Sequence, residues 1–367
     1  SVGTTSKFSA RSDCAASSGC TYAEEVQNFS NWYAYYRTRM QAMKSGVGIA
    51  FNPLGGAYRV GFMTIHPDNS ATSYLPLSEF GTTQKSSWYS DLYGAEPATA
   101  TGYTETPLRA ALSTVGRLFA GQKPLTGRTD GGGDPMQYAC QQNFVLMTTD
   151  GYWREEDETK ITKIDGTTKI ADQDGAASPP FYDGDQTVGA STISTCPLGS
   201  GNAACQAHAA TECSGASTTT NTSIYKSCNT LADVSYYYFN TDIRTGTAGT
   251  GTCLGGPVPV SSSATASFDV CTNLTTTGTA QPQRMTTFTV GLGVDGLLKY
   301  QDNYSTALSG DYYNILNGTQ VWPQVKWNDN TGVDDLWHAA VNGGGTYFSA
   351  KTPSVLQQGI SNAIATS

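Results

Sequence analysis

The chain has 367 residues, with 21 Lys and Arg against 30 Asp and Glu, and a net charge of −9 at pH 7. This acidic balance argues against nucleic acid as the main partner. The 38% of hydrophobic residues allow one large domain or two ordinary ones, and no apolar run is long enough to span a bilayer.

The first part of the chain predicts helices and one strand. In 21–44, apolar residues recur at three-to-four spacing, which predicts one amphipathic helix packed on a sheet. The apolar run 58–65 predicts a strand, and 85–94 a short helix. A further helix follows, with Thr106 as its N-cap, and ends at Gly121.

The second part repeats a pattern of strand, turn and helix. Strands are expected at 143–153 and 286–296, then a helix at 334–341, a strand at 346–350 and a last helix at 353–364. Strands that alternate with helices predict an α/β fold, with a mostly parallel sheet and helices on both faces. Function in such folds usually lies at the carboxyl ends of the strands.

This pattern stops between 153 and 285, where Thr, Ser, Gly and Cys predominate. We therefore expect residues 1–153 and 285–367 to form one domain, and 154–284 to be a disulfide-rich insertion of antiparallel strands and loops. The run 234–240 is strand-like.

Nine cysteines indicate an oxidising compartment outside the cell. The spacings within the insertion lack the short C-x2-C pairs of zinc sites, so disulfides are favoured over a metal. Three cysteines remain elsewhere in the chain, so either one thiol is free or its partner lies outside this sequence. The six in the insertion are Cys196, Cys205, Cys213, Cys228, Cys253 and Cys271, and the other three are Cys14, Cys20 and Cys140.

Other polar clusters have plain interpretations. Acidic residues between Asp165 and Asp185, and between Asp329 and Asp335, are interpreted as solvated loops, although a calcium loop is conceivable. His338 lies among apolar residues and is expected to be a hydrogen-bonded core histidine. No nucleophile elbow, zinc-protease motif or P-loop is present, which argues against an enzyme.

Five segments in order resemble the von Willebrand factor A-like region of the PilY family, adhesins associated with type IV pilus tips. They are NFSNWYAYYRTRM (28–40), GYTETPLRAAL (102–112), CQQNFVLMTTDGYW (140–153), MTTFTVGLGVDG (285–296) and DDLWHAAVNGGGTYFSAKTPSVLQQGI (334–360). The resemblance implies a von Willebrand A-like doubly wound sheet. It also implies an extracellular, non-enzymatic adhesion module at the pilus tip, active in surface or host attachment and in pilus biogenesis through minor pilins.

Such domains commonly hold Mg²⁺ or Ca²⁺ with oxygens from three loops. By the resemblance, Thr104 and Asp150 are the candidate metal ligands, from the second and third loops. The first loop, Asp-x-Ser-x-Ser, is missing before the helix at 21–44; Asp68 to Thr72 is a near match in the wrong place. Two ligands are too few for tight binding, so we expect weak or no divalent binding by this chain alone.

The strand that should carry the first loop is central in this fold, so its absence predicts a slot in the sheet. We expect a strand from elsewhere to fill it: an upstream fragment of the same precursor, residues 1–10, or a neighbouring subunit by strand addition. The last source suggests an alternative function, a structural subunit of an extracellular filament that polymerises by strand complementation.

Overall fold

The computed structural model describes 19 separate stretches of the chain. They are residues 5–6, 11–16, 19–66, 73–97, 106–122, 125, 135–136, 141–153, 160–183, 185–189, 218–219, 222–226, 229–243, 258–259, 267–269, 274–275, 283–325, 329–350 and 353–366. No helix within these ranges combines the length and apolar character needed to cross a bilayer. The six cysteines of the expected insertion, Cys140 and the loop 68–72 lie outside the described residues.

Three parallel strands form the centre of the molecule: β5 (Asn143–Thr149), β12 (Met285–Leu292) and β13 (Gly344–Ala350), in the order β13-β12-β5. Met147 faces Thr289 across the first pair, and Thr289 faces Tyr347 across the second. Parallel strands need long connections, and helices supply several of them here. The expected α/β class with a parallel sheet is therefore confirmed.

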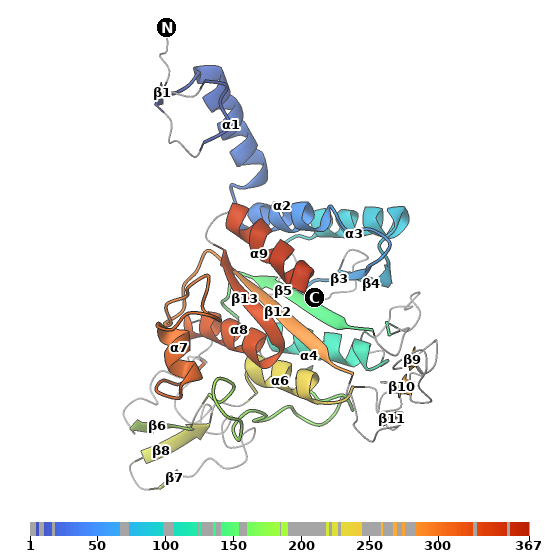
Figure 1. The fold of residues 1–367 in the computed structure, drawn as a ribbon, viewed down its shortest axis with the longest axis vertical. Coiled ribbons are helices and arrows are strands. Elements are labelled where there is room, and N and C mark those ends of the chain that lie inside the picture. Colours follow the sequence, from blue (N-terminus) through green and yellow to red (C-terminus); the bar gives the residue numbers. More distant parts are fainter. Residues whose placement is uncertain are drawn as a thin grey trace.

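Helices cover both faces of this sheet (Figure 1). On one face lie α4 (Leu108–Phe119), α6 (Leu231–Asn240) and α8 (Thr331–Asn342); on the other lie α2 (Arg39–Phe51) and α9 (Pro353–Thr366). Successive side chains of a strand point to opposite faces. Accordingly, Tyr347 packs in the core with α8, whereas the next residue, Phe348, packs against the core with α2 and α9.

A second, two-stranded sheet lies beyond β5 in Figure 1. Its antiparallel strands are β3 (Arg59–Met63) and β4 (Tyr74–Glu79), and helix α3 (Thr82–Gly94) packs on them. The buried Trp88 of α3 contacts Phe51, Phe62 and Phe80, which ties this hairpin to α2. The hairpin and β5 thus belong to one body but share no strand pairing.

The expected single helix at 21–44 is wrong, because the chain breaks at Tyr36–Thr38 into α1 (Tyr22–Tyr35) and α2. The cause is local: Thr38 begins a new capping box, in which its hydroxyl accepts the Gln41 N–H at 3.1 Å and the Gln41 side chain accepts the Thr38 N–H. Helix α1 has no buried residue and extends away from the body (Figure 1), so its apolar stripe does not pack on a sheet.

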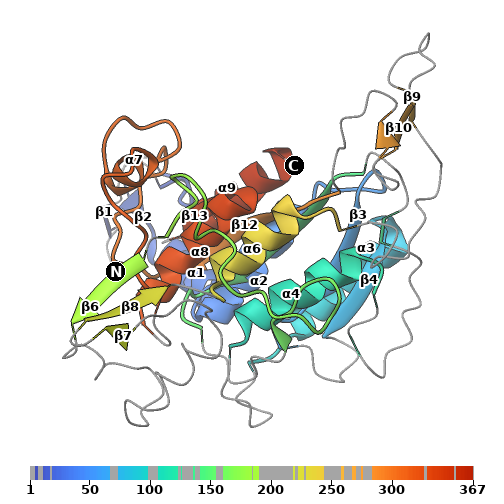
Figure 2. The ribbon, with the colours of Figure 1, turned by 90° about the horizontal axis from the view of Figure 1, so that it is seen from below.

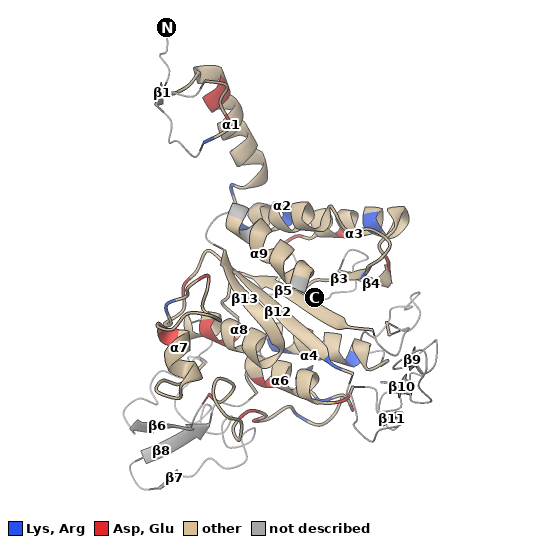
Figure 3. Ribbon diagram, viewed as in Figure 1, with Lys and Arg blue, Asp and Glu red and all other residues tan. Residues whose placement is uncertain are grey.

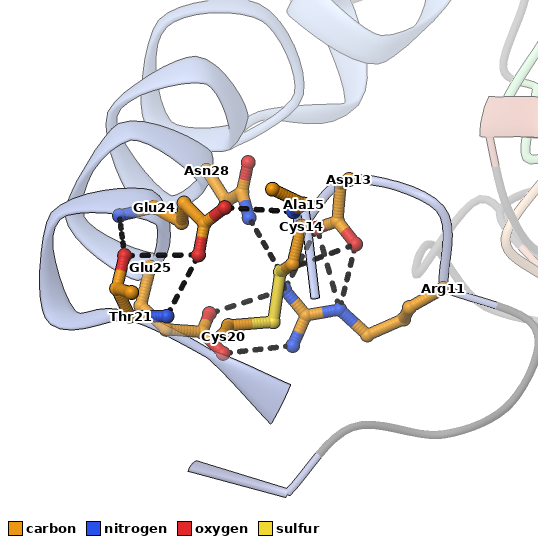
Figure 4. The surroundings of a disulfide bond; sticks show 9 residues. All are labelled: Arg11, Asp13, Cys14, Ala15, Cys20, Thr21, Glu24, Glu25 and Asn28. Carbon is orange, nitrogen blue, oxygen red and sulfur yellow. Dashed lines mark hydrogen bonds and ion pairs between the residues drawn. A yellow bond between two sulfur atoms is a disulfide. The ribbon is translucent and has the colours of Figure 1, made fainter. Parts of the chain in front are cut away.

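A disulfide between Cys14 and Cys20 closes the loop before α1 (Figure 4). Beside it, the Arg11 guanidinium pairs with Asp13 at 2.7 Å and with Glu25 at 2.9 Å. Two of the three cysteines outside the expected insertion therefore pair with each other.

The expected strand at 234–240 is also wrong, because these residues form the buried helix α6. Thr230 caps the helix by accepting the Asp233 N–H at 3.0 Å, and the Asp233 carboxylate accepts the Thr230 N–H at 2.9 Å. Leu231, Val234 and Tyr238, at helical spacing, lie in the main core. This part of the expected insertion therefore contributes to the same core as the sheet.

The remaining elements are short and peripheral (Figure 2). Strands in 185–275 pair antiparallel, as expected for that segment. These elements are β1 (Thr5–Ser6), β2 (Gly19–Cys20), β6 (Asp185–Gly189), β7 (Thr218–Thr219), β8 (Thr222–Lys226), β9 (Val258–Pro259), β10 (Ser267–Asp269), β11 (Leu274–Thr275) and α7 (Asp311–Leu316).

Candidate functional site

Asp150, one of the two expected metal ligands, lies at the carboxyl end of β5. Its carboxylate pairs with the guanidinium of Arg39, the first residue of α2, at 3.1 Å, and both side chains are largely exposed. Gly151 follows with φ +93°, a conformation that favours glycine, and its N–H donates to the Thr149 hydroxyl at 3.2 Å. The turn thus has the expected strand-end position, with an arginine at the carboxylate.

Thr104, the other expected ligand, lies outside the described residues. Metal binding by Thr104 and Asp150 stays a prediction. An exposed ion pair such as Arg39–Asp150 contributes little to stability, so a cation could displace the arginine at small cost.

A groove of about 680 Å³ runs between β3 and β5. Consecutive residues of both strands line it, from Tyr58 to Ile65 on one wall and from Gln141 to Thr148 on the other. Successive side chains of a strand point to opposite faces, so a groove that touched only one face would be lined by every second residue. Here every residue lines the groove, which means that each strand borders it with its edge.

None of the described strands pairs with the groove-side edge of β5. Among the described residues, the backbone hydrogen bonds of Phe144 to Thr148 run to β12 alone. An edge strand leaves about half of its N–H and C=O groups pointing outward, ready to pair with another chain. Phe144, Val145 and Leu146 are only half-buried here, although apolar strand residues between two helical layers are normally buried.

The groove is also closed above and below by apolar helix faces. Val115 and Phe119 of α4 line one side, and Val47 and Phe51 of α2 line the other. Arg59 and Glu79 are the only charged residues among the described lining. Figure 3 shows the same character over the central strands, where β5, β12 and β13 carry no charged residue. The groove is thus a mainly apolar space bordered by two strands and by two helix faces.

Several acidic residues that the sequence placed in solvated loops are buried, so that interpretation is wrong for them: Asp174, Asp183, Asp334 and Asp335. The carboxylate of Asp334 accepts the N–H groups of Leu297 and Leu298, at 2.8 and 3.0 Å. Burial raises the pKa of Asp334 to about 6, although these two donors lower it. The expected place of His338 is confirmed, because it is buried and its Nε2 lies 2.7 Å from the Phe181 carbonyl oxygen.

Asp335 performs a similar task at the start of α6. Its carboxylate oxygens accept the N–H groups of Leu231 and Ala232, at 3.0 and 3.1 Å. Burial raises the pKa of Asp335 to about 6, while these donors and the nearby Arg109 lower it. Both carboxylates thus connect backbone segments that are far apart in the sequence.

Comparison with known proteins finds three curated relatives, each called type IV pilus biogenesis factor PilY1, from Pseudomonas aeruginosa. The chain is 25% identical to the protein of strain PAO1 over 95% of its own length, and 25% and 26% identical to those of strains PAK and UCBPP-PA14 over 91%. The chain is thus similar to a part of PilY1 over nearly its whole length.

The chain spans about a quarter of the length of these PilY1 relatives, 27% in the first case and 25% in the other two. No family model matches the chain, and no solved structure does. The α/β fold with its parallel sheet is shown by the structure itself. The closer assignment to a von Willebrand A fold stays a prediction.

Proposed function

We propose that this chain is an extracellular module of a type IV pilus biogenesis factor and that it acts at the pilus tip. The observation that carries this proposal is the similarity to PilY1 over 95% of the chain. Adhesion to a surface or host ligand, and contact with minor pilins, are the activities we assign to it. The Cys14–Cys20 disulfide and the low fraction of charged residues support an extracellular setting.

A chimaeric protein tests the proposal. The matching quarter of P. aeruginosa PilY1 is replaced by this chain in a strain that lacks its own copy, and surface pili are counted by electron microscopy. We expect the chimaera to restore pili, whereas PilY1 lacking the same quarter does not. The proposal would be contradicted if PilY1 lacking this quarter gave wild-type numbers of pili. It would also be contradicted if the chimaera were exported intact but no pili formed.

The groove between β3 and β5 supports a further part of this function, the completion of the sheet by a strand from outside residues 21–367. We propose that this strand is a segment of a longer polypeptide, because the relatives are about four times as long as this chain. A strand with helices on both faces reads as a nearly continuous run of Val, Ile and Leu, and it would lie parallel to β5. Along the seven residues of β5 it would extend roughly 23 Å.

A charged side chain introduced into the groove tests whether a strand from elsewhere enters it. Val145→Lys places an ammonium on the half-buried wall, so an apolar strand could no longer enter without burying that charge. Ser78→Lys, on an exposed position of β4 outside the groove, is the matched control. In the chimaera we expect loss of pili with the first substitution alone.

A filament subunit is the second candidate, favoured by the same open edge of β5. In that case a neighbouring copy supplies the strand. Light scattering on the purified chain separates the two functions: a mass near 38.8 kDa at all concentrations supports the tip module, whereas growing linear polymers support the filament.

A further inference from the structure

Helix α1 carries an exposed apolar stripe along its whole length. We call it the α1 stripe, and its members are Tyr22, Val26, Phe29, Trp32 and Tyr33. No residue of α1 is buried, and the members of the stripe are each 44–62% exposed. Four of them recur at spacings of four, three and four residues, which places their side chains on one side of the helix. The fifth, Trp32, lies beside this row, with its ring centroid 5.7 Å from that of Phe29.

The loop before α1 holds the start of the helix through polar contacts (Figure 4). The Glu24 side chain completes the capping box, and Glu25 pairs with Arg11 at 2.9 Å. The Cys14–Cys20 disulfide closes this loop. Both acidic residues of α1 are thus engaged at the start of the helix, and no member of the α1 stripe carries a charge.

Among the described residues, α1 lacks the usual source of helix stability. A helix of 14 residues is marginal in water by itself, and in proteins most of its stability comes from packing of its apolar face. An exposed apolar patch of several hundred Å² also often marks an interaction site. The stripe ends at Tyr33, where the Arg37 guanidinium lies 4.2 Å from the centre of the ring. We therefore expect a partner to cover the helix from Tyr22 to Tyr33.

The area of the α1 stripe indicates which kind of partner covers it. A large aromatic side chain has about 150–250 Å² to bury, so the exposed fractions amount to roughly 500 Å² on α1 and about 1,000 Å² counted on both partners. Interfaces between domains of one chain bury roughly 600–1,500 Å², whereas obligate dimers bury about 2,000 Å² or more. A contact this small suffices when the partner is tethered, because a linker provides an effective concentration in the millimolar range.

We propose that α1 docks through this stripe onto another domain of a longer polypeptide, against an apolar, uncharged face of that domain. The relatives are about four times as long as this chain, which leaves room for further domains. Because α1 extends away from the body, the partner can cover the stripe without contacting the central sheet (Figure 1). This docking rests on the proposed function only through the premise of a longer polypeptide, and it needs neither the groove nor adhesion.

Hydrogen–deuterium exchange of residues 22–35 tests the docking, in the isolated chain and in the longer protein that contains it. In the isolated chain we expect the amides of α1 to exchange faster than those of the buried helix α8, because no residue of α1 is buried. In the longer protein, exchange in 22–35 should slow at least about tenfold, because opening of the helix then requires release of its partner. Pilus counts play no part in this measurement, so the docking and the proposed function can fail independently.

Substitutions locate the contact. Phe29→Lys places an ammonium in the middle of the stripe; in the longer protein it should return exchange in 22–35 to within about twofold of the isolated chain, because the charge cannot be buried against an apolar face. Asn31→Lys is the matched control, because Asn31 is exposed on the opposite side of the helix, and it should leave the protection unchanged. Val26→Lys, at another exposed member of the stripe, serves if the first variant does not fold.

Three results would overturn the proposal. The first is equal exchange of 22–35 in the isolated chain and in the longer protein. The second is protection in the isolated chain that rises with protein concentration, which would assign the stripe to a second copy. The third is protection in the longer protein that survives both Phe29→Lys and Val26→Lys, which would mean that another side of α1 makes the contact.

Discussion

Replacement of Asp335 by Asn should have an effect on stability that depends on pH. The wild-type carboxyl has a pKa of about 6 in the folded protein, against about 3.9 when unfolded. A raised carboxyl pKa means that the folded state holds the proton more tightly, so this group's contribution to stability falls as pH rises through the window from about 4 to about 6.

The magnitude follows from the two pKa values. Each unit of pKa is about 1.4 kcal/mol, so between pH 7.5 and pH 5 the wild type gains about 1.4 kcal/mol relative to Asp335→Asn, whose side chain does not titrate. The variant also has a single acceptor oxygen for the N–H groups of Leu231 and Ala232, which costs about 1–3 kcal/mol at any pH. The loss on mutation should therefore be larger at pH 5 than at pH 7.5.

Urea unfolding of both proteins at the two pH values, in EDTA, measures this difference. Asp335→Ala is the control, because it removes the same titrating group together with both acceptors. The stability lost on this substitution should depend on pH in the same way, with a larger loss of unfolding free energy that is the same at both pH values. An equal loss at both pH values, or a larger one at pH 7.5, would refute the reasoning that burial dominates over the N–H donors at Asp335.

Three further substitutions test the packing. Gly116→Ala should destabilise the protein by about 1–3 kcal/mol in urea, because a Cβ there would meet the buried Tyr238 ring; an unchanged midpoint would contradict this contact. Thr230→Ala should cost about 1–2 kcal/mol through loss of the α6 cap, and a neutral result would mean that the cap is dispensable. Cys20→Ser should speed amide exchange in 22–35 while the melting temperature of the body stays the same, because α1 has no buried residue; a lowered melting temperature would mean that the N-terminal arm supports the body.

The sequence was informative where local pattern and tertiary structure agree. The apolar runs at 143–149 and 285–292 form strands that lie between the two helical layers. The helix at Leu108–Phe119 follows from its buried stripe of Leu108, Leu112 and Phe119. A groove lies between β3 and β5, and its identity with the expected slot stays a prediction.

Elsewhere tertiary contacts outweighed the local sequence pattern, or the sequence held no local pattern to use. The aromatic run Tyr236 to Phe239 favours a strand by propensity, but the capping box at Thr230 and burial against α4 and α8 make it a helix. The buried acids could not be predicted from their polar, Gly-rich surroundings. Their donors lie far away in sequence, as with Asp335 and Leu231, which are 104 residues apart.

We propose above that a strand from outside residues 21–367 completes the sheet between β3 and β5. The most direct measurement is an experimental structure of the chain within the longer protein. We expect an extended apolar segment in the groove, parallel to β5 and hydrogen-bonded to Phe144 to Thr148. Direct pairing of β3 with β5, or side chains of the chain's own helices filling the groove, would contradict it.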